Sequence, residues 1–299
     1  MKKILLLALA ALGASAMISS CDYDNPDPDK SVIEEETRKN NAFDDWLDAN
    51  FVYPYNIDFK YRMEDIESDM NYTLVPSRLD CSVAMAHLLK YLCLEAYDEV
   101  AGVDFTRRYF PKQVHLIGSP AYNNNGTIVL GVAEGGKKIT LYNTNSLPSI
   151  INNVEMLNKW YFSTIHHEFT HILHQTKPYA ESFKTISGTD YVADYWSEEP
   201  YVTQYLKRGF ITDYSQKNAD EDLAEMVSKY VTNTEEYWNS KLNEAGTDGA
   251  AIIQSKLEFI RKYLSTEWGL DIDELRSVIL RREDDVISGR IDLSDISLD

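Results

Sequence analysis

Alternation of hydrophobic and polar positions in the first half of the chain predicts a small β-sheet. "YNIDFKYRM" (55–63) alternates apolar and polar residues, as a half-buried strand does. Three further strands are predicted at 114–118, 126–133 and 137–143, and the turn signals "NNNG" and "EGG" separate them. The last of these could be an edge strand that pairs with an extended peptide.

Helical periodicity precedes these strands and dominates the rest of the chain. Residues 31–50 predict an acidic amphipathic helix, and 82–100 predict a mostly buried one. The apolar side of the first holds Phe43, Trp46 and Leu47. In the second half the predicted helices are 153–176, 197–208, 218–232, 234–243, 249–266 and 271–287. A sheet-bearing half followed by an all-helical half predicts an α+β fold.

The first twenty residues have the pattern of an export signal. Lys2 and Lys3 precede an apolar run that is too short for a membrane-spanning helix, and small residues follow. Cleavage after Ala16 would release an ordinary exported protein. Cleavage before Cys21, which we favour, would leave a cysteine for lipidation and predicts a lipoprotein of the outer membrane, on its cell-surface or periplasmic face.

The remaining chain divides into a tether and one large domain. The acidic, proline-containing residues 21–30 predict a flexible tether, and 31–299 predict a single domain with a mixed lobe (31–150) and a helical lobe (151–299). Cys81 and Cys93 are twelve positions apart in a predicted helix, about 18 Å, which is too far for a disulfide. We therefore expect two buried free thiols.

The charge of the chain argues against two kinds of partner. Removal of residues 1–20 takes away two lysines and no acid, so the formal net charge changes from −19 to −21. Such a chain would repel nucleic acid and anionic lipid, so we expect no nucleic-acid partner and membrane attachment only through the lipid on Cys21.

The stretch "HHEFTHILHQ" (166–175) predicts a zinc site on an amphipathic helix. His167 and His171 are four residues apart and therefore lie one turn apart on one face, where two imidazoles can hold a single ion. Glu168 is offset by about 100° around the helix, beside the water that such an ion would activate. This H-E-x-x-H spacing is typical of zinc peptidases, with two ligands and a general base.

The remaining histidines receive no metal role. His166 lies on the flank, where we expect contact with solvent or neighbouring backbone. His174 follows His171 by three residues without a glycine to turn the chain back, so it is not our third ligand. His87 and His115 fall inside a predicted helix and a predicted strand, and we interpret both as core histidines.

The third ligand is predicted in "NADEDLAEMVSKYV" (218–231). Glu221 and Glu225 stand four apart on one helix face. We assign Glu221 to zinc and Glu225 to the free N–H of a ligand histidine, and the two roles could be exchanged. A rival ligand is Asp190 or Asp194 in "SGTDYVADYW", which resembles an aspartate-ligand pattern but misses it by one residue. Four tyrosines could donate to a reaction oxyanion, and the sequence does not choose among them: Tyr191, Tyr195, Tyr201 and Tyr214.

The chain resembles the zinc-binding metallopeptidase family of Bacteroidetes lipoproteins, also called substrate import-associated zinc metallohydrolase lipoproteins. The resemblance runs over nearly the whole mature chain. It is carried by "YPYNIDFKYR", "GSPAYNNNGTIVLGVAEGGKKITLYN", "HHEFTHILHQ", "GFITDYS…EDLAEMVSKYV" and "WGLDIDELRSVILRR".

The resemblance implies His167, His171 and Glu221 as zinc ligands and Glu168 as the base. "EDLAE" is also similar to the glutamate helix of gluzincin peptidases, although fifty positions separate His171 from Glu221. Family members are similar to proteins encoded beside TonB-dependent outer-membrane import systems, which implies a role with nutrient uptake.

Two classes of function follow from the sequence. The first is a zinc metallopeptidase with a zincin-like fold and one zinc ion per chain, which hydrolyses a peptide or glycopeptide; hydrolysis of a non-peptide amide or ester is a variant of it. The alternative is a lipid-anchored binding or accessory component of an uptake system, with a structural or vestigial zinc site. The presence of Glu168 favours the enzyme, because a structural site has no need of a base.

Overall fold

The computed structural model describes residues 40–63, 71–122, 128–129, 131–134 and 137–298 of the 299-residue chain. Residues 41–299 form one compact unit. The predicted export signal, the predicted tether and the first part of the helix predicted at 31–50 lie outside the described residues.

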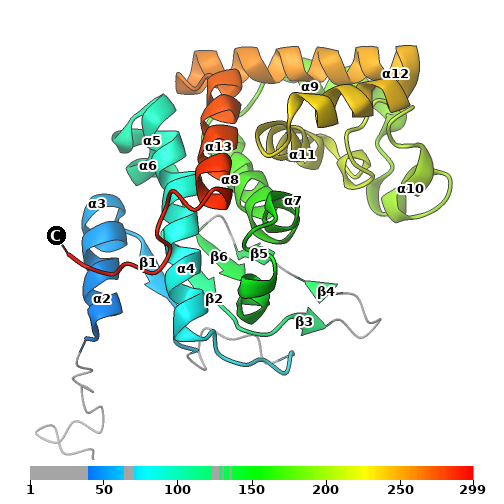
Figure 1. The fold of residues 1–299 in the computed structure, drawn as a ribbon. Coiled ribbons are helices and arrows are strands. Elements are labelled where there is room, and N and C mark those ends of the chain that lie inside the picture. The colour runs from blue at the N-terminus through cyan, green and yellow to red at the C-terminus, as the bar shows by residue number, and fades with distance from the viewer. Residues whose placement is uncertain (1–39, 64–70, 123–127, 130, 135–136, 299) are drawn as a thin grey trace, which may run out of the picture. The chain divides into compact units, whose positions relative to one another are not determined.

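A four-stranded sheet with the order β1-β2-β6-β5 occupies the lower part of Figure 1. β1 (Asp58–Lys60), β2 (Gln113–Leu116) and β6 (Lys138–Leu141) are parallel, and β5 (Gly131–Glu134) pairs with β6 in the antiparallel direction. β3 (Ala121–Tyr122) and β4 (Ile128–Val129) form a separate antiparallel pair. Three of the four predicted strands are present but shorter, whereas the one predicted at 126–133 is divided between β4 and β5, which belong to different sheets. His115 is buried in β2, as expected of a core histidine.

The prediction that 137–143 forms an edge strand is wrong. β6 lies between β2 and β5, so the hydrogen-bonding groups of both its edges are already paired. The reason is that the chain doubles back and adds β5 to the outer side of β6. Among the described strands of this sheet, β1 and β5 are the edges, and β5 lies beside α8 (Ser163–Thr176).

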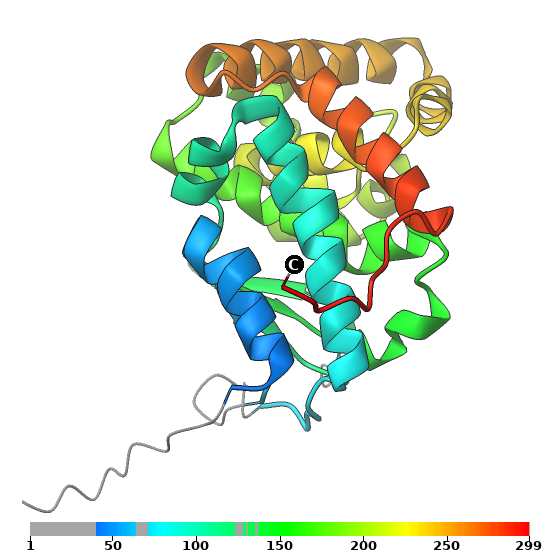
Figure 2. The same ribbon diagram turned by 60° about the vertical axis from the view of Figure 1, so that its left-hand side comes forward.

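The helices predicted at 31–50 and 82–100 are confirmed where the structure describes them. The first is α2 (Ala42–Leu47) with a π-helical turn at Asp48–Val52, and the second is α4 (Leu79–Leu89) and α5 (Glu95–Ala101) with a π-helical turn at Lys90–Leu94 between them. Two short helices were not predicted, α3 (Tyr53–Tyr55) and α6 (Val103–Tyr109). Phe43, Trp46 and Leu47 are buried as predicted, and the Phe43 ring packs on Phe59 of β1. α2 and α4 stand side by side in Figures 1 and 2. The ring centroids of Trp46 in α2 and His87 in α4 are 4.4 Å apart.

The second half is helical, and no strand follows Leu141 in the part of the chain that the structure describes. Its α-helices are α7 (Val154–Leu157), α8, α9 (Ser182–Ser187), α10 (Tyr201–Gln204), α11 (Ala219–Val231), α12 (Glu235–Tyr263) and α13 (Ile272–Ile287). The two helices predicted at 234–243 and 249–266 form α12, in which Gly246 interrupts the helical backbone with φ 71°. α12 runs along the upper edge of Figure 1, and α13 runs downward from it.

The prediction of a helix over 197–208 is wrong for most of its length. Only the four residues of α10 are α-helical, directly after Pro200, which lacks a backbone N–H and begins rather than continues a helix. Arg208 lies beyond it and donates to Gln216 and to the Asp190 carbonyl. The segment is thus fixed by side-chain bonds to neighbouring loops.

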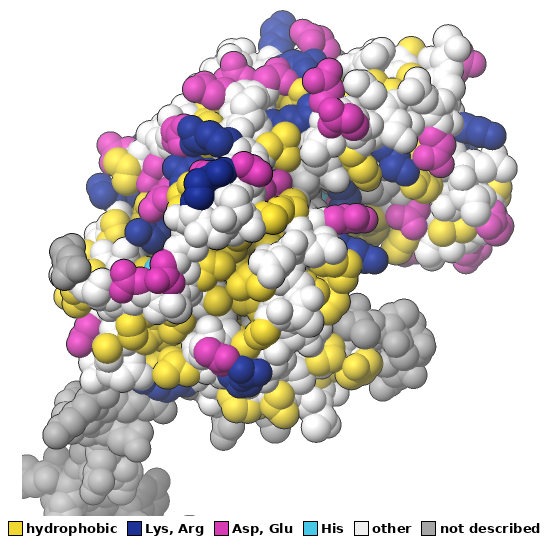
Figure 3. Space-filling view, in the orientation of Figure 1, with side chains coloured by type: hydrophobic (Ala, Val, Ile, Leu, Met, Phe, Trp, Pro, Cys, Tyr) yellow, Lys and Arg dark blue, Asp and Glu magenta, His cyan; other side chains and the backbone are white. Residues whose placement is uncertain are grey.

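Charged side chains are frequent on the surface of this acidic chain, and the two cysteines are in the state that the sequence predicts. On the face shown in Figure 3, acidic and basic side chains are intermixed over the upper helices, and hydrophobic ones are more frequent lower down. Cys81 and Cys93 are both buried and free, as predicted. Within the described ranges, none of the helices is both long and apolar enough to cross a membrane.

Candidate metal centre

The helix α8 presents one side to the core and another to a cavity. Its apolar stripe is buried, and the Phe169 ring contacts those of Tyr97, Phe105 and Phe110 at 4.9, 5.7 and 5.1 Å between centroids. Because this stripe fixes the rotation of the helix, His167 and His171 are turned toward α11.

α11 runs along α8 in the opposite direction. Asn218 caps its N-terminus and accepts hydrogen bonds from the backbone N–H groups of Asp220 and Glu221, so Glu221 stands in the first turn. Farther along, the Ser228 hydroxyl donates to the Ser163 carbonyl at 2.6 Å. Later residues of α11 thus meet earlier residues of α8, and this antiparallel packing brings Glu221 opposite the two histidines.

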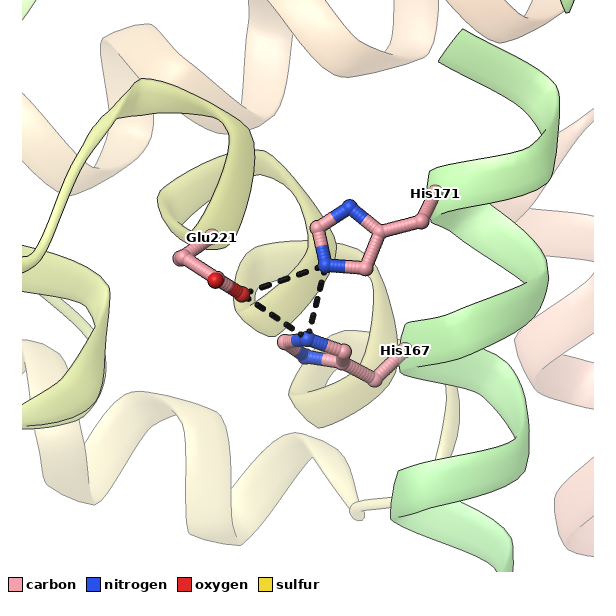
Figure 4. Close-up of side chains that lie close together, drawn as sticks. All are labelled: His167, His171 and Glu221. Atoms are coloured by element: carbon pink, nitrogen blue, oxygen red, sulfur yellow. Dashed lines mark hydrogen bonds and ion pairs between the residues drawn. The ribbon is translucent and has the colours of Figure 1, made fainter. Parts of the chain in front are cut away.

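Three side chains converge at this contact, as Figure 4 shows. The Nε2 atoms of His167 and His171 are 3.0 Å apart, and each is 3.1 Å from Oε2 of Glu221. Among the described residues these three form the one group of at least three histidine, cysteine or acidic side chains whose donor atoms all lie within 4.8 Å. The structure therefore brings together the three residues that the sequence assigned to zinc.

The donor set fits a zinc ion. Ligand atoms about 2.0–2.1 Å from a tetrahedral zinc lie roughly 3.3 Å from one another, close to the three observed separations. Hydrogen bonds alone explain the arrangement poorly, because no protonation state of the two rings turns all three contacts into hydrogen bonds. If both Nε2 atoms carry a proton, the two protons face each other, and if one does not, its lone pair faces the carboxylate oxygen. Two imidazoles and one carboxylate also match a common set in zinc peptidases, which leaves the fourth position open.

Each histidine is held through its second ring nitrogen. Nδ1 of His167 donates to Oε1 of Glu225 at 2.8 Å, which leaves Nε2 free to bind a cation. Glu225 thus accepts the free N–H of a proposed ligand histidine, as the sequence analysis expected. Nδ1 of His171 lies 2.8 Å from Nε2 of His174, a partner that the sequence analysis missed. The three-residue interval between these histidines is the signal that could have indicated it.

The charges of the cluster support one another. Burial alone would lower the pKa of His167, but hydrogen bonds to Glu221 and Glu225 raise it to about 9. Burial would raise the pKa of Glu221, and its bonds to the two histidines instead hold it far below the usual range. The cluster therefore favours a cation at its centre, whether protons or a metal ion supply the charge.

A cavity of about 380 Å³ opens onto the cluster, and Glu168 lines it. Burial raises the pKa of Glu168. Its carboxylate has no hydrogen bond to another described side chain, so it is available to a molecule in the cavity. The cavity is also lined by Lys159, Ser163, Thr164, His167, His171, Tyr214, Glu221, Glu225 and Lys229.

Of the four candidate tyrosines, Tyr214 is the one that lines the cavity. Its hydroxyl donates to Oε1 of Glu221 at 3.0 Å. Tyr191 instead donates to Asp222, Tyr195 is 61% exposed, and Tyr201 stacks against Arg208. None of these three lines the cavity.

The structure does not support the positions that the sequence analysis considered for three residues. Asp190 and Asp194, the rival ligands, are exposed and outside the three-residue cluster. The expectation that His166 faces solvent or backbone is wrong, because its side chain is 1% exposed and its Nδ1 is 3.0 Å from the Tyr97 hydroxyl. At one residue from His167 it lies about 100° around the helix, on the side that packs into the core.

A buried ion pair holds α11 against α12. Asp222 and Lys256 are both 0% exposed, and Lys256 Nζ lies 2.7 Å from Oδ2 of Asp222. Lys256 also donates to the Gly209 carbonyl at 2.7 Å. The sequence analysis did not identify this pair, because a single lysine in a long helix carries no signal of its partner. It fixes the turn of α11 that carries Glu221.

Comparison with known proteins identifies the family. The family described as "Putative zinc-binding metallo-peptidase" matches residues 35–273. The chain belongs to this family. A crystal structure at 2.10 Å of a protein from Bacteroides caccae with the same description is 42% identical to this chain. The similarity covers 89% of this chain and 100% of that one, with a TM-score of 0.77. No curated protein matches the chain. The family description supports a zinc hydrolase, and the similarity to the solved structure supports the mixed α/β fold.

Proposed function

We propose that this protein is a zinc-dependent peptidase of zincin-like fold, in which His167, His171 and Glu221 hold one zinc ion and Glu168 is the general base. The observation that carries the proposal is the convergence of two imidazole nitrogens and one carboxylate oxygen at 3.0–3.1 Å, on the wall of a cavity that Glu168 also lines. The family description points to the same activity.

The side chains around the cluster have separate roles in this proposal. Zinc lowers the pKa of water and polarises a carbonyl when it is bound at such a site. Glu168 accepts the proton of the attacking water and returns it to the leaving amine. Tyr214 donates its hydroxyl to the oxyanion of the tetrahedral intermediate, in exchange for its bond to Glu221. Glu225 and His174 hold the two ligand rings.

The cellular setting extends the proposal. The export signal and Cys21 support a lipoprotein anchored in the outer membrane, and the family resemblance supports work beside a TonB-dependent importer. A surface peptidase there would trim peptides or glycopeptides before uptake. Metabolic labelling with an azido or alkynyl fatty acid tests the anchor, since Cys21→Ala would lose the label.

The test of the activity compares wild type with Glu168→Gln on a peptide library, after both are shown to contain stoichiometric zinc. We expect a loss of about 10²–10⁴-fold in cleavage, because glutamine cannot accept the proton. Glu155→Gln, at an exposed position on α7, is the matched control. Equal cleavage by wild type and Glu168→Gln would rule out the proposed base, and cleavage of no peptide by zinc-loaded wild type would leave the accessory-protein alternative.

A further inference from the structure

Two lysines stand at the end of the cavity away from the ligand cluster. Lys159 and Lys229 both line the cavity that also holds Glu168 and the proposed zinc ligands. Lys159 is exposed, and Lys229 is half-buried. Neither forms an ion pair with an acidic side chain in the described part of the chain. Both therefore bring a positive charge to one cavity in a chain with net charge −19.

The directions of α8 and α11 place both lysines on the same side of the ligand cluster, at one end of the cavity. Lys159 precedes His167 by eight residues, and Lys229 follows Glu221 by eight. Because α8 and α11 run in opposite directions, both intervals lead the same way from the ligand cluster. Eight residues of helix span about 12 Å.

A third lysine at the cavity shows the contrast. Lys217 Nζ lies 3.2 Å from Oε1 of Glu221 and 3.0 Å from the Tyr214 hydroxyl. Its charge is therefore used within the ligand cluster. Lys159 and Lys229 also line the cavity but have no such bond, although the charge of Lys229 acts on Glu225 as well.

We propose that Lys159 and Lys229 form a subsite for a carboxylate, so that preferred substrates carry an acidic side chain or a free C-terminus a few residues from the scissile bond. This inference rests on the proposed peptidase function. An extended peptide advances about 3.3 Å per residue, so the 12 Å interval corresponds to about four residues, and to two or three if a lysine side chain extends along the cavity toward the cluster. Two cations on the wall of one cavity attract a carboxylate and select against basic substrates.

Lys229 also has a possible structural use, which the experiment must separate from binding. It stands in the last turn of α11, where a cation is favourable, and it stabilises the charge of Glu225. A purely structural role would alter folding stability or zinc affinity and would affect acidic and neutral substrates alike. A subsite role changes the ratio between them.

The experiment measures kcat/KM on zinc-loaded protein with fluorogenic hexapeptides that differ only in charge. One set exchanges Glu for Gln at each position from two to four residues on either side of the scissile bond, and a second set exchanges a free C-terminus for an amide. The two sets distinguish an acidic side chain from a terminal carboxylate. The variants are Lys159→Met, Lys229→Met and their double, with Lys207→Met/Lys262→Met, two exposed lysines outside the cavity, as the control of equal charge.

We expect wild type and the control to prefer one acidic peptide over its neutral partner by about tenfold, a few-fold for each partly exposed lysine. In the double variant the ratio of kcat/KM for the acidic peptide to that for the neutral one should be close to one. Lys229→Arg keeps the charge and should therefore keep the wild-type ratio, and 0.5 M salt should reduce the ratio of wild type. A ratio near one in wild type, or a preserved ratio in the double variant, would overturn the subsite.

A binding measurement keeps this result distinct from the proposed peptidase activity. Fluorescence anisotropy of the same labelled peptides on zinc-loaded Glu168→Gln protein, with and without the two lysine substitutions, needs no turnover. If no peptide is cleaved but the acidic one binds through the lysines, the peptidase proposal fails and the carboxylate subsite stands. If acidic and neutral peptides bind equally, the subsite fails.

Discussion

His166 and His167 are neighbours in the chain, but their side chains lie in opposite electrostatic environments. His166 packs beside Tyr97 and Cys93, where burial without an acidic partner lowers its pKa to about 3. His167 is nearly as buried, yet hydrogen bonds to Glu221 and Glu225 raise its pKa to about 9. Burial is similar in the two cases, so the acidic partners on α11 make the difference.

Two carboxylates, half-buried Glu221 and buried Glu283, repeat this contrast. Glu221 lies between two histidines and Lys217, which hold its pKa far below the usual range against the effect of burial. Glu283 on α13 receives only the amide N–H of Asn158 at 2.8 Å, and burial raises its pKa to about 7. The proposed metal face, defined by His167 and His171 of α8 and Glu221 of α11, therefore favours charged groups. The core side, with His166 and Glu283, is built for neutral groups.

The largest effect, on zinc affinity, should come from replacing His167, and replacement of its neighbour His166 gives the comparison. His167→Ala removes a proposed ligand and should lower zinc affinity by more than about 100-fold, beyond the loss typical of residues that only orient a ligand. His166→Phe fills the core position and should retain stoichiometric zinc. Metal content after dialysis against graded chelator measures both. Equal zinc loss in the two variants would contradict the assignment of separate roles.

A pH effect on stability should distinguish Glu283 from the metal-face acids. The folded protein holds the Glu283 proton up to about pH 7, whereas the unfolded chain loses it near pH 4.5. The stabilisation from this group is therefore complete below pH 4.5 and lost as pH rises to about 7, roughly 3 kcal/mol in all.

Glu283→Gln cannot ionise, so its stability relative to wild type should rise over that interval. Urea unfolding at pH 5 and pH 8 measures the change, with the exposed Glu267→Gln as control. A constant difference between Glu283→Gln and wild type at both pH values would show that Glu283 is charged in the folded protein.

Removal of the outer partners should weaken zinc binding to a smaller degree. Glu225→Ala leaves Nδ1 of His167 without its acceptor, and His174→Phe does the same for His171. We expect each to lower zinc affinity by about 10–100-fold. Competition with a chromogenic zinc chelator gives the values. Unchanged affinity in both would mean that the rings are held by packing alone.

The smallest effect should follow from Tyr97→Phe on the core side. The substitution leaves Nδ1 of His166 buried without its partner and should lower the free energy of unfolding by about 1–2 kcal/mol. Zinc affinity should stay at the wild-type value, because the metal face is untouched. A loss of zinc in Tyr97→Phe would couple the two sides of α8.

The sequence predicted those parts of the fold and candidate site that depend on local spacing. The four-residue interval of His167 and His171, the apolar stripe behind them and the capped start of α11 are all local patterns. Glu221 was found because a glutamate in a first helical turn is a common zinc ligand. The structure brings these residues together, and their binding of zinc stays a prediction.

What the sequence missed depends on packing between distant segments. The partner of His166 is Tyr97, on a helix about seventy positions earlier, and the choice of Tyr214 depends on which loop closes the cavity. The position of β6 inside the sheet depends on β5 folding back along it. The ion pair of Asp222 with Lys256 joins two helices whose spacing along the chain carries no periodic signal.

The most direct test of the central claim is anomalous diffraction at the zinc edge from crystals grown with zinc. The account predicts one strong peak about 2.0–2.2 Å from Nε2 of His167, Nε2 of His171 and Oε2 of Glu221. A zinc peak coordinated by other residues, such as Asp190 or Asp194, or no peak among these three atoms, would contradict it.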